Sequence, residues 1–316
     1  MTDFYSSEQI SHLLSMKECI TVMKELFSMD KDELINPLRS KMVLPERPVG
    51  IMGMMPAYIR PYQLMGIKVL SVFPENYKQG LSSHQGILHL FETKTGQLLA
   101  SFDADEITAI RTAAVSGLMT DLLATKSATQ LCLLGSGKQA EMHLAAISEI
   151  RTIQNVTVWS QDKSHAAAFC TKVRSRYKNI NFSICETVEA ATAEADIICT
   201  VTASRHPILQ NQALKENVHI NAVGACTPDA RELSSELVLQ GEVYIDNYLA
   251  TTHEAGDLII PAAEKGLAIE SLIKSDIHEL LKDPSSDHAS KLTIFKSVGV
   301  AIEDLAAAYH CYKKLN

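Results

Sequence analysis

The sequence contains no pair of cysteines in CxxC spacing, no block of basic residues, and no apolar run approaching the roughly 20 residues that a membrane span requires. Its seven cysteines are odd in number and scattered, so we expect free thiols in a reducing cytoplasm and neither a disulfide framework nor a zinc site. The formal charge of -8 gives no electrostatic reason to expect nucleic acid as a partner. Residues 1–14 lack a basic segment followed by an apolar one, so no secretory signal peptide is expected.

The first part of the chain combines a helical segment with β-like runs. Residues 6–29 space their apolar side chains as a helix does. Residues 38–102 form short runs rich in Val, Ile, Leu, Phe and Met, and the segment TKTG at 93–96 is typical of a hairpin turn. These runs predict a mostly antiparallel sheet. The Ala-rich residues 103–124 predict a helix that connects two domains.

From about residue 129, apolar strands alternate with helical segments. The predicted strands are TQLCLLG, NVTVWS, NINFSIC, ADIICTVTA, NVHINAVG and EVYIDN. Such alternation predicts a parallel, doubly wound sheet covered on both faces. After residue 250 the pattern indicates loops and short helices, and the chain closes with a strand or turn followed by a helix.

The segment LCLLGSGKQAE has the spacing of a dinucleotide-binding loop, in which Gly135 permits a tight turn and Gly137 lets the backbone approach a pyrophosphate. Ala140 takes the third, small position, where the helix packs close to the strand. The start of that helix offers free N–H groups to phosphates, and we include Lys138 and Gln139 among the cofactor contacts. The preceding strand and the strand–helix units that follow strengthen the prediction of a dinucleotide.

The end of the second strand of this domain bears on the choice between NAD and NADP. An acid that binds the ribose hydroxyls of NAD is expected about 20 residues after the loop, and Ser160 occupies that place. We therefore favour NADP(H) over NAD(H), with Ser160, Gln161 and Lys163 as cofactor contacts. NAD stays open, because no Arg follows and Asp162 lies nearby.

Several motifs together resemble those of the ornithine cyclodeaminase/mu-crystallin family. They are GIKVLSVFPEN, SSHQG, EITAIRTAAVSG, LLGSGKQAE, INAVGACTPDAREL, EAGDL and TIFKSVGVAIED, and they run nearly end to end. The resemblance implies a Rossmann-type domain inserted into a β-rich α+β domain for substrate binding and dimerisation, hence an overall α/β fold. We place the β-rich domain at 1–118 and 294–316 and the dinucleotide-binding domain at 119–293, with residues from about 294 packing on the first domain.

The resemblance also implies roles for single residues. Arg39 and Arg111 match arginines that bind a substrate carboxylate, for which a planar guanidinium is suited, and Arg111 is also expected to contact the cofactor. Lys68 matches a lysine near the reacting nitrogen, which can transfer a proton if desolvation and neighbouring arginines depress its pKa. The remaining expected contacts are His84 and Val298 for the substrate and Ser83, Thr202, Ala222, Val223 and Gly224 for the cofactor.

One departure from the family pattern bears on the reaction. Cys226 stands where family members that cyclise ornithine have an aspartate, and a thiol is a poor anchor for an ammonium group. We therefore predict an NAD(P)H-dependent reductase of cyclic imine carboxylates, Δ1-pyrroline-2-carboxylate or Δ1-piperideine-2-carboxylate, giving L-proline or L-pipecolate. The alternatives are an ornithine cyclodeaminase or an alanine-dehydrogenase-like oxidoreductase. We expect a cytoplasmic homodimer with no metal.

Overall fold

The computed structural model describes residues 3–45, 50–211, 214–283 and 291–315. The chain divides into unit 1, which comprises Met1–Thr112 and Val300–Asn316, and unit 2, which comprises Ala113–Gly299. In the described part of the chain, no helix is both long and apolar enough to cross a membrane.

Unit 1 is built on a mixed sheet with the strand order β1-β7-β6-β5-β4-β2, in which β3 also pairs with β4. Neighbouring strands are antiparallel except β1 and β7, so the predicted mostly antiparallel sheet is confirmed. The strands are β1 Phe4–Tyr5, β2 Leu34–Ile35, β3 Ser40–Val43, β4 Ile51–Ile59, β5 Leu64–Val72, β6 His84–Glu92 and β7 Leu98–Asp103. The predicted turn at 93–96 joins β6 to β7, and Gly96 adopts the left-handed φ of 76° there.

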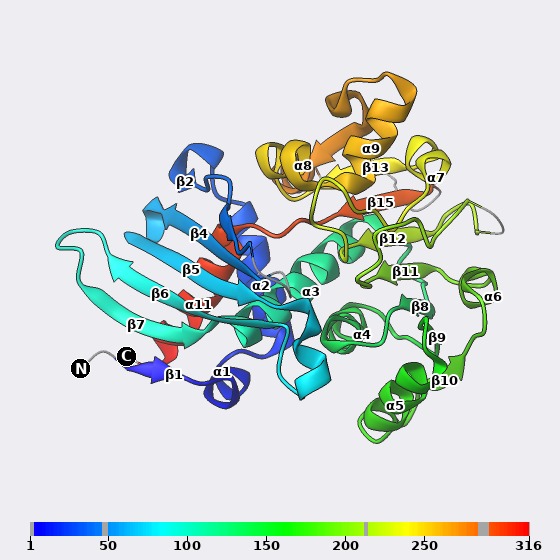
Figure 1. The fold of residues 1–316 in the computed structure, drawn as a ribbon, viewed down its shortest axis with the longest axis horizontal. Helices are drawn as coiled ribbons and strands as arrows, with labels where there is room; N and C mark the ends of the chain where they lie inside the picture. Colours follow the sequence, from blue (N-terminus) through cyan, green and yellow to red (C-terminus); the bar gives the residue numbers. More distant parts are fainter. Residues whose placement is uncertain (1–2, 46–49, 212–213, 284–290, 316) are drawn as a thin grey trace. The chain divides into compact units, whose positions relative to one another are not determined.

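The helices of unit 1 are α1 Ser7–Leu13, α2 Met16–Phe27 and α11 Ala301–Leu315, together with the first half of α3 Ala104–Leu123. The helical pattern of residues 6–29 therefore forms two helices, because Ser15 starts α2 with a capping box that it shares with Glu18. Helix α11 contacts β4, β5 and β6, and Figure 1 shows it (red) lying along one face of the sheet. That face forms the interior of unit 1.

Unit 2 is built on an eight-stranded sheet with the order β10-β9-β8-β11-β12-β15-β13-β14, and every pair of neighbours is parallel. This confirms the predicted α/β fold. The strands are β8 Gln130–Leu134, β9 Asn155–Trp159, β10 Asn181–Ile184, β11 Ile197–Thr200, β12 His219–Ala222, β13 Glu242–Ile245, β14 Ile273–Asp276 and β15 Thr293–Lys296. The helices are α4 Lys138–Ile150, α5 Lys163–Arg174, α6 Val188–Thr192, α7 Ser235–Gln240, α8 Tyr248–Glu254, α9 Gly256–Lys265 and α10 Ile277–Lys282.

Strand β15 belongs to unit 2, whereas the predicted boundary places residues from 294 onward in the first domain. It pairs with β12 and β13 inside the parallel sheet, so residues 294–299 belong to unit 2 and the chain returns to unit 1 at Val300. The first boundary between the two units falls after Thr112, within α3, whereas the predicted boundary falls after residue 118. Strand β14 was not predicted, because four residues between two helices show no clear alternation.

The register of the parallel sheet aligns the carboxyl ends of its central strands. Thr200 at the end of β11 lies beside Leu134 at the end of β8 and beside Ala222 at the end of β12. The sheet order also reverses direction on either side of β8, since the chain moves from β8 out to β10 and then crosses to β11. In open α/β sheets this reversal at the carboxyl ends is where ligands bind.

Candidate functional site

Lys68 lies in the middle of β5 and points to the face that packs against α11. Strands alternate their side chains, so Lys68 shares this face with Leu64 and Gly66, and only 2% of its side chain is exposed. Its Nζ donates to Asp304 of α11 at 2.6 Å and to Thr108 of α3 at 3.2 Å. A charged group thus lies inside unit 1 with a carboxylate partner.

The surroundings of Lys68 prepare it for proton exchange. Burial lowers its pKa to about 8, with the positive charges of Arg111 and Arg39 acting in the same direction and Asp304 opposing them. An ammonium group with a pKa close to neutral can give up and regain a proton at physiological pH. The pKa direction and the two arginines are those that the sequence analysis expected.

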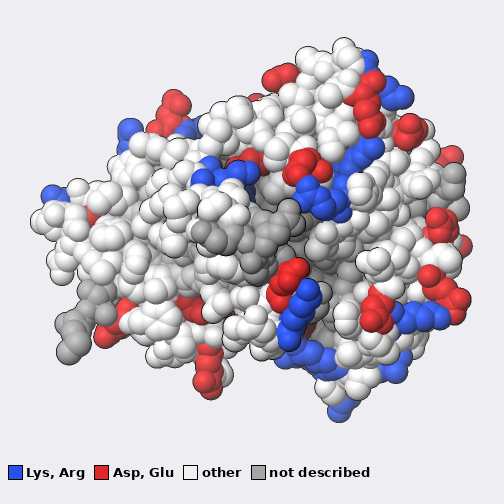
Figure 2. Space-filling model, viewed as in Figure 1, with Lys and Arg blue, Asp and Glu red and all other residues white. Residues whose placement is uncertain are grey.

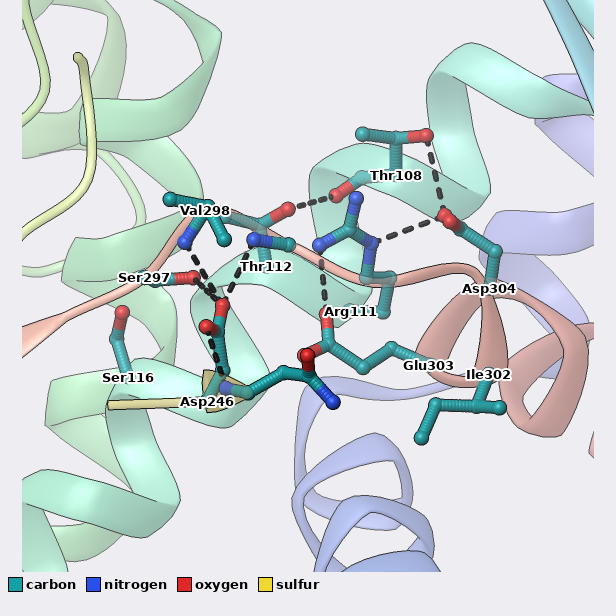
Figure 3. Close-up of polar contacts among 12 residues, drawn as sticks. Thr108, Arg111, Thr112, Ser116, Asp246, Ser297, Val298, Ile302, Glu303 and Asp304 are labelled. Atoms are coloured by element: carbon teal, nitrogen blue, oxygen red, sulfur yellow. Dashed lines mark hydrogen bonds and ion pairs between the residues drawn. The ribbon is translucent and has the colours of Figure 1, made fainter. Parts of the chain in front are cut away.

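Arg111 lies one turn after Thr108 on α3 and is also buried. Its Nε donates to Asp304 at 2.9 Å and its Nη1 donates to Glu303 at 2.6 Å, as Figure 3 shows. Burial disfavours the charged guanidinium, but the two carboxylates more than compensate and raise the pKa of Arg111. Its Nη2 has no hydrogen-bond partner among the described residues, so this end of a charged guanidinium is available to an anionic ligand.

The two carboxylates come from the first turn of α11. Glu303 and Asp304 have no exposed side-chain surface, and acidic groups are favoured at a helix N-terminus. Burial acts to raise the pKa of Asp304, but the positive charges of Arg111 and Lys68 have the larger effect. The net pKa is lowered, so the carboxyl is ionised at neutral pH. We call Lys68, Arg111, Glu303 and Asp304 the buried charge cluster.

Three other predicted residues of unit 1 lie around this cluster. Arg39 is half-buried in the segment before β3, close enough to influence the pKa of Lys68. His84 is exposed at the start of β6, and its Nδ1 lies 3.0 Å from Oγ of Ser83. His84 and Lys68 also interact electrostatically. The structure thus gathers Arg39, Lys68, His84 and Arg111 into one region of unit 1.

In unit 2, the glycine loop connects β8 to α4. Gly135 has a φ of 119°, and a Cβ there would meet the carbonyl oxygen of Val201 at 2.7 Å, so only glycine fits this turn. Gly137 is the N-cap of α4, so no side chain caps the first N–H groups of this helix. A Cβ built on Gly137 would meet nothing within 4 Å. Ala140 is fully buried against the sheet. An uncapped helix start beside open space fits the pyrophosphate of a dinucleotide.

The ends of β11 and β12 are fixed by one buried carboxylate. Glu232 accepts hydrogen bonds from Thr200 Oγ1 at 2.7 Å, from the backbone N–H of Thr202 at 2.7 Å and from that of Gly224 at 2.8 Å. Burial raises the pKa of Glu232, and the neighbouring Asp257 raises it further. The predicted cofactor contacts Thr202, Ala222, Val223 and Gly224 therefore lie at one edge of the sheet, on a braced backbone.

The end of β9 holds no free acid. Asp162 is the N-cap of α5, and its Oδ1 accepts from the backbone N–H of Ser164 at 2.8 Å and from its hydroxyl at 2.7 Å. Ser160 and Gln161 precede it, and Lys163 pairs with Glu186. The carboxylate that could have served an NAD ribose is thus occupied in capping a helix.

Two further residues have clear positions. Val298 is buried in unit 2, and its backbone N–H donates to Asp246 at 2.7 Å, which fixes the segment before Val300. Cys226 is exposed after β12 and is a free thiol.

Sequence reasoning missed Glu303, Asp304 and Glu232. The sequence around Glu303 and Asp304 carried a signal, because these two acids lie between the apolar residues Ile302 and Leu305 of an Ala- and Leu-rich helix. An acid inside an apolar stripe indicates a buried partner of opposite charge. Glu232 follows PDAR at the start of a run with no such stripe, so nothing local marked it.

The two halves are those of a dinucleotide-dependent enzyme: a glycine loop at the switch point of a parallel sheet, and a separate unit with buried cations. A family model described as "Ornithine cyclodeaminase/mu-crystallin family" matches residues 1–316. The chain is 34% identical to the ketimine reductase mu-crystallin of Mus musculus over 98% of this chain and 96% of that protein. It therefore belongs to the ornithine cyclodeaminase/mu-crystallin family, as its motifs indicated.

Solved structures agree with this assignment. The Δ1-pyrroline-2-carboxylate reductase of Thermococcus litoralis, in complex with NADH and L-proline, matches with a TM-score of 0.93 and 32% identity, over 98% of this chain and 96% of that one. An archaeal alanine dehydrogenase dimer with bound NAD matches with a TM-score of 0.89 and 27% identity, over 99% of this chain and 95% of that one.

Proposed function

We propose that this protein reduces a cyclic imine carboxylate, Δ1-pyrroline-2-carboxylate or Δ1-piperideine-2-carboxylate, to L-proline or L-pipecolate. The observation that carries the proposal is the buried charge cluster, which offers an anion-binding guanidinium and an ammonium group with a pKa of about 8 in one interior. A small substrate with a carboxylate beside a C=N bond uses both groups. Relatives named as ketimine and Δ1-pyrroline-2-carboxylate reductases support this choice.

In this proposal Arg111 and Arg39 bind the substrate carboxylate, since guanidinium groups recognise carboxylates with paired donors. Lys68 gives its proton to the imine nitrogen as the adjacent carbon becomes tetrahedral, so that C=N becomes CH–NH and Lys68 is left neutral until solvent reprotonates it. His84 hydrogen-bonds the substrate, and Val298 provides an apolar contact. These four contacts and the proton transfer are part of the proposal.

The cofactor of the proposal is a nicotinamide dinucleotide, which supplies the hydride when bound. Its pyrophosphate lies on the loop of Gly135, Gly137 and Ala140, with Lys138 and Gln139 in the first turn of α4. The other proposed contacts are Ser83, Arg111, Ser160, Gln161, Lys163, Thr202, Ala222, Val223 and Gly224. The glycine loop needs no side chain for this task, because the helix start provides backbone donors.

We further propose that NADP(H) is preferred over NAD(H). Two observations support this: Ser160 replaces the expected acid, and Asp162 is engaged by Ser164. Ser160 adds no negative charge that would repel a 2′-phosphate, and the carboxylate of Asp162 is held at the start of α5. The preference would distinguish this protein from the Thermococcus litoralis relative, which was solved with NADH.

We also propose that the protein is a homodimer. A cytoplasmic location stays a prediction, which is based on its free thiols. The face of the unit 1 sheet opposite α11 is apolar: the exposed large side chains there are Ile35, Met42, Met52, Met65 and Ile87. A groove of about 500 Å³ on this face is lined by Pro56, Met65 and Ile67 among others. Figure 2 shows little charge over β4 to β7, whereas Lys, Arg, Asp and Glu are interspersed elsewhere. A second copy of the chain is the proposed occupant, and the archaeal alanine dehydrogenase to which the chain is similar was solved as a dimer.

The proposed reaction is tested by following NADPH oxidation with the purified protein and a panel of imines and amino acids. We expect turnover of Δ1-pyrroline-2-carboxylate or Δ1-piperideine-2-carboxylate and its loss in Lys68→Met, which removes the proton donor and keeps the volume. Release of ammonia from L-ornithine without imine reduction would contradict the proposal. So would turnover by Lys68→Met at the wild-type rate.

A further inference from the structure

We propose that Asp304 is a positioning residue for the reduction, which holds the ammonium group of Lys68 in one orientation and keeps it protonated. The inference rests on the proposed function, because it concerns the proton that Lys68 gives to the imine nitrogen. Asp304 itself touches neither substrate nor cofactor in this scheme and acts through Lys68.

The hydrogen bonds define the orientation. An ammonium group has three N–H donors, and Lys68 gives one to Oδ2 of Asp304 and one to Oγ1 of Thr108. The third has no partner among the described residues. With two donors fixed at 2.6 Å and 3.2 Å, the tetrahedral geometry of Nζ aims the third in a set direction. That third donor is the one available to a substrate nitrogen.

Asp304 is itself held rigidly. Its Oδ1 accepts from Nε of Arg111 at 2.9 Å and from Oγ1 of Thr108 at 3.3 Å, while Oδ2 faces Lys68. The carboxylate therefore links the ammonium group of Lys68 to the guanidinium of Arg111. One residue fixes the position of the proposed proton donor relative to a proposed carboxylate-binding group.

The charges around Lys68 come from several elements. Arg111 lies on α3, Arg39 precedes β3 and His84 starts β6, and the first two lower the pKa of Lys68. Glu303 and Asp304 come from α11. Burial raises the pKa of the nearby Cys19 thiol of α2, to which the charges of these two carboxylates add, so the thiol stays neutral. Against burial and two arginines, Asp304 makes the largest contribution that keeps Lys68 protonated.

The pH dependence of turnover follows from this balance. A general acid works while it is protonated, so wild-type kcat falls as pH rises through the pKa of Lys68, about 8. Asp304→Asn removes the contribution that raises this pKa and keeps the shape of the side chain. We expect the alkaline limb of the kcat profile to move roughly one to three pH units lower, the effect typical of losing a neighbouring opposite charge.

Glu303→Gln is the matched control. Glu303 is the preceding residue, has the same burial and contacts Arg111 at 2.6 Å, but makes no hydrogen bond to Lys68. We expect this variant to change KM for the imine carboxylate through Arg111 and to leave the alkaline limb near its wild-type pH. Asp304→Glu, which restores the charge, should return the limb towards pH 8 even where kcat is lower.

The outcomes separate this inference from the proposed function. If wild-type protein reduces no imine carboxylate, the proposed function fails, and the pKa of Lys68 can still be followed by NMR of ¹³Cε-labelled lysine, with Lys68→Met assigning the signal. A lower Lys68 pKa in Asp304→Asn than in wild type and in Glu303→Gln supports the inference. An alkaline limb and a Lys68 pKa that stay unchanged in Asp304→Asn, or that move equally in Glu303→Gln, overturn it.

Discussion

The positive charges of Lys68 and Arg111 are balanced inside unit 1 by carboxylates of the same unit, without any ligand. An ammonium or guanidinium group taken out of water without a counterion costs several kcal/mol, and Asp304 and Glu303 offset that cost at distances of 2.6–2.9 Å. Removing one partner of a buried pair typically costs about 3–5 kcal/mol. Amide variants are preferable to alanine here because they keep the shape of the side chain and an oxygen that accepts hydrogen bonds. The pairing lets unit 1 hold two buried cations without unfolding, as the proposed binding of a carboxylate substrate requires.

A single residue at the end of β9 is expected to set the cofactor preference. Ser160→Asp places a carboxylate where it would accept hydrogen bonds from the ribose hydroxyls of NADH and would repel a 2′-phosphate. Wild-type protein should show a higher kcat/KM with NADPH than with NADH, and Ser160→Asp should reverse the order, measured at saturating imine. Ser183→Asp, which adds the same charge at an exposed site on β10, should leave the ratio unchanged. Wild-type preference for NADH contradicts this prediction.

Residue-level prediction reached the cations and missed their partners. The alternation along β5 could not say which way Lys68 points, since Met65 and Ile67 on one side and Leu64 on the other are all apolar. Motif resemblance, and not pattern, singled it out. Asp304 lies 236 positions away from Lys68, so its role depends on tertiary packing that no local window contains.

At the scale of elements, the sequence predicted which segments form strands and helices, but not the residues at which they end or the side chains that cap them. The predicted strand segments between residues 129 and 247 contain β8 to β13, and β8 and β11 have the nearly continuous apolar character of buried parallel strands. The break between α1 and α2 depended on the hydroxyl of Ser15, which outweighs an unbroken apolar spacing. The brace of Glu232 joins the ends of β11 and β12 only once the parallel register has formed.

Two glycines at these strand ends should respond differently to the same substitution. A Cβ at Gly224 would meet the carbonyl oxygen of Thr202 at 2.2 Å and Oε1 of Glu232 at 2.6 Å, so Gly224→Ala should lower stability by about 1–3 kcal/mol, the usual cost of overpacking. Gly137→Ala meets nothing within 4 Å and should leave Tm nearly unchanged, yet weaken NADPH binding because the methyl group occupies the approach to the pyrophosphate. Thermal melting and fluorescence titration with NADPH measure both effects. Equal losses of Tm in the two variants would refute this distinction.

At the scale of the whole molecule, the chain interrupts unit 1 to build unit 2 and then returns. Composition and alternation indicated two domains, but only the family resemblance indicated the return of the last helix. The return has a chemical consequence, since α11 brings Glu303 and Asp304 to cations encoded in the first 112 residues. With α11 covering one face of the unit 1 sheet, the apolar residues of the opposite face are left for another partner.

The opposite face provides the test of assembly. Met65 is 39% exposed near the start of β5, between Tyr58 of β4 and Phe91 of β6, so a charge there would be buried unpaired by a second copy. Analytical ultracentrifugation should give wild-type protein twice the 34.7 kDa of one chain, and Met65→Glu the mass of one chain. Leu249→Glu adds the same charge at a 48% exposed leucine on α8 and should remain dimeric. A monomeric wild type, or a Met65→Glu variant that stays dimeric, would show that this face does not join two copies.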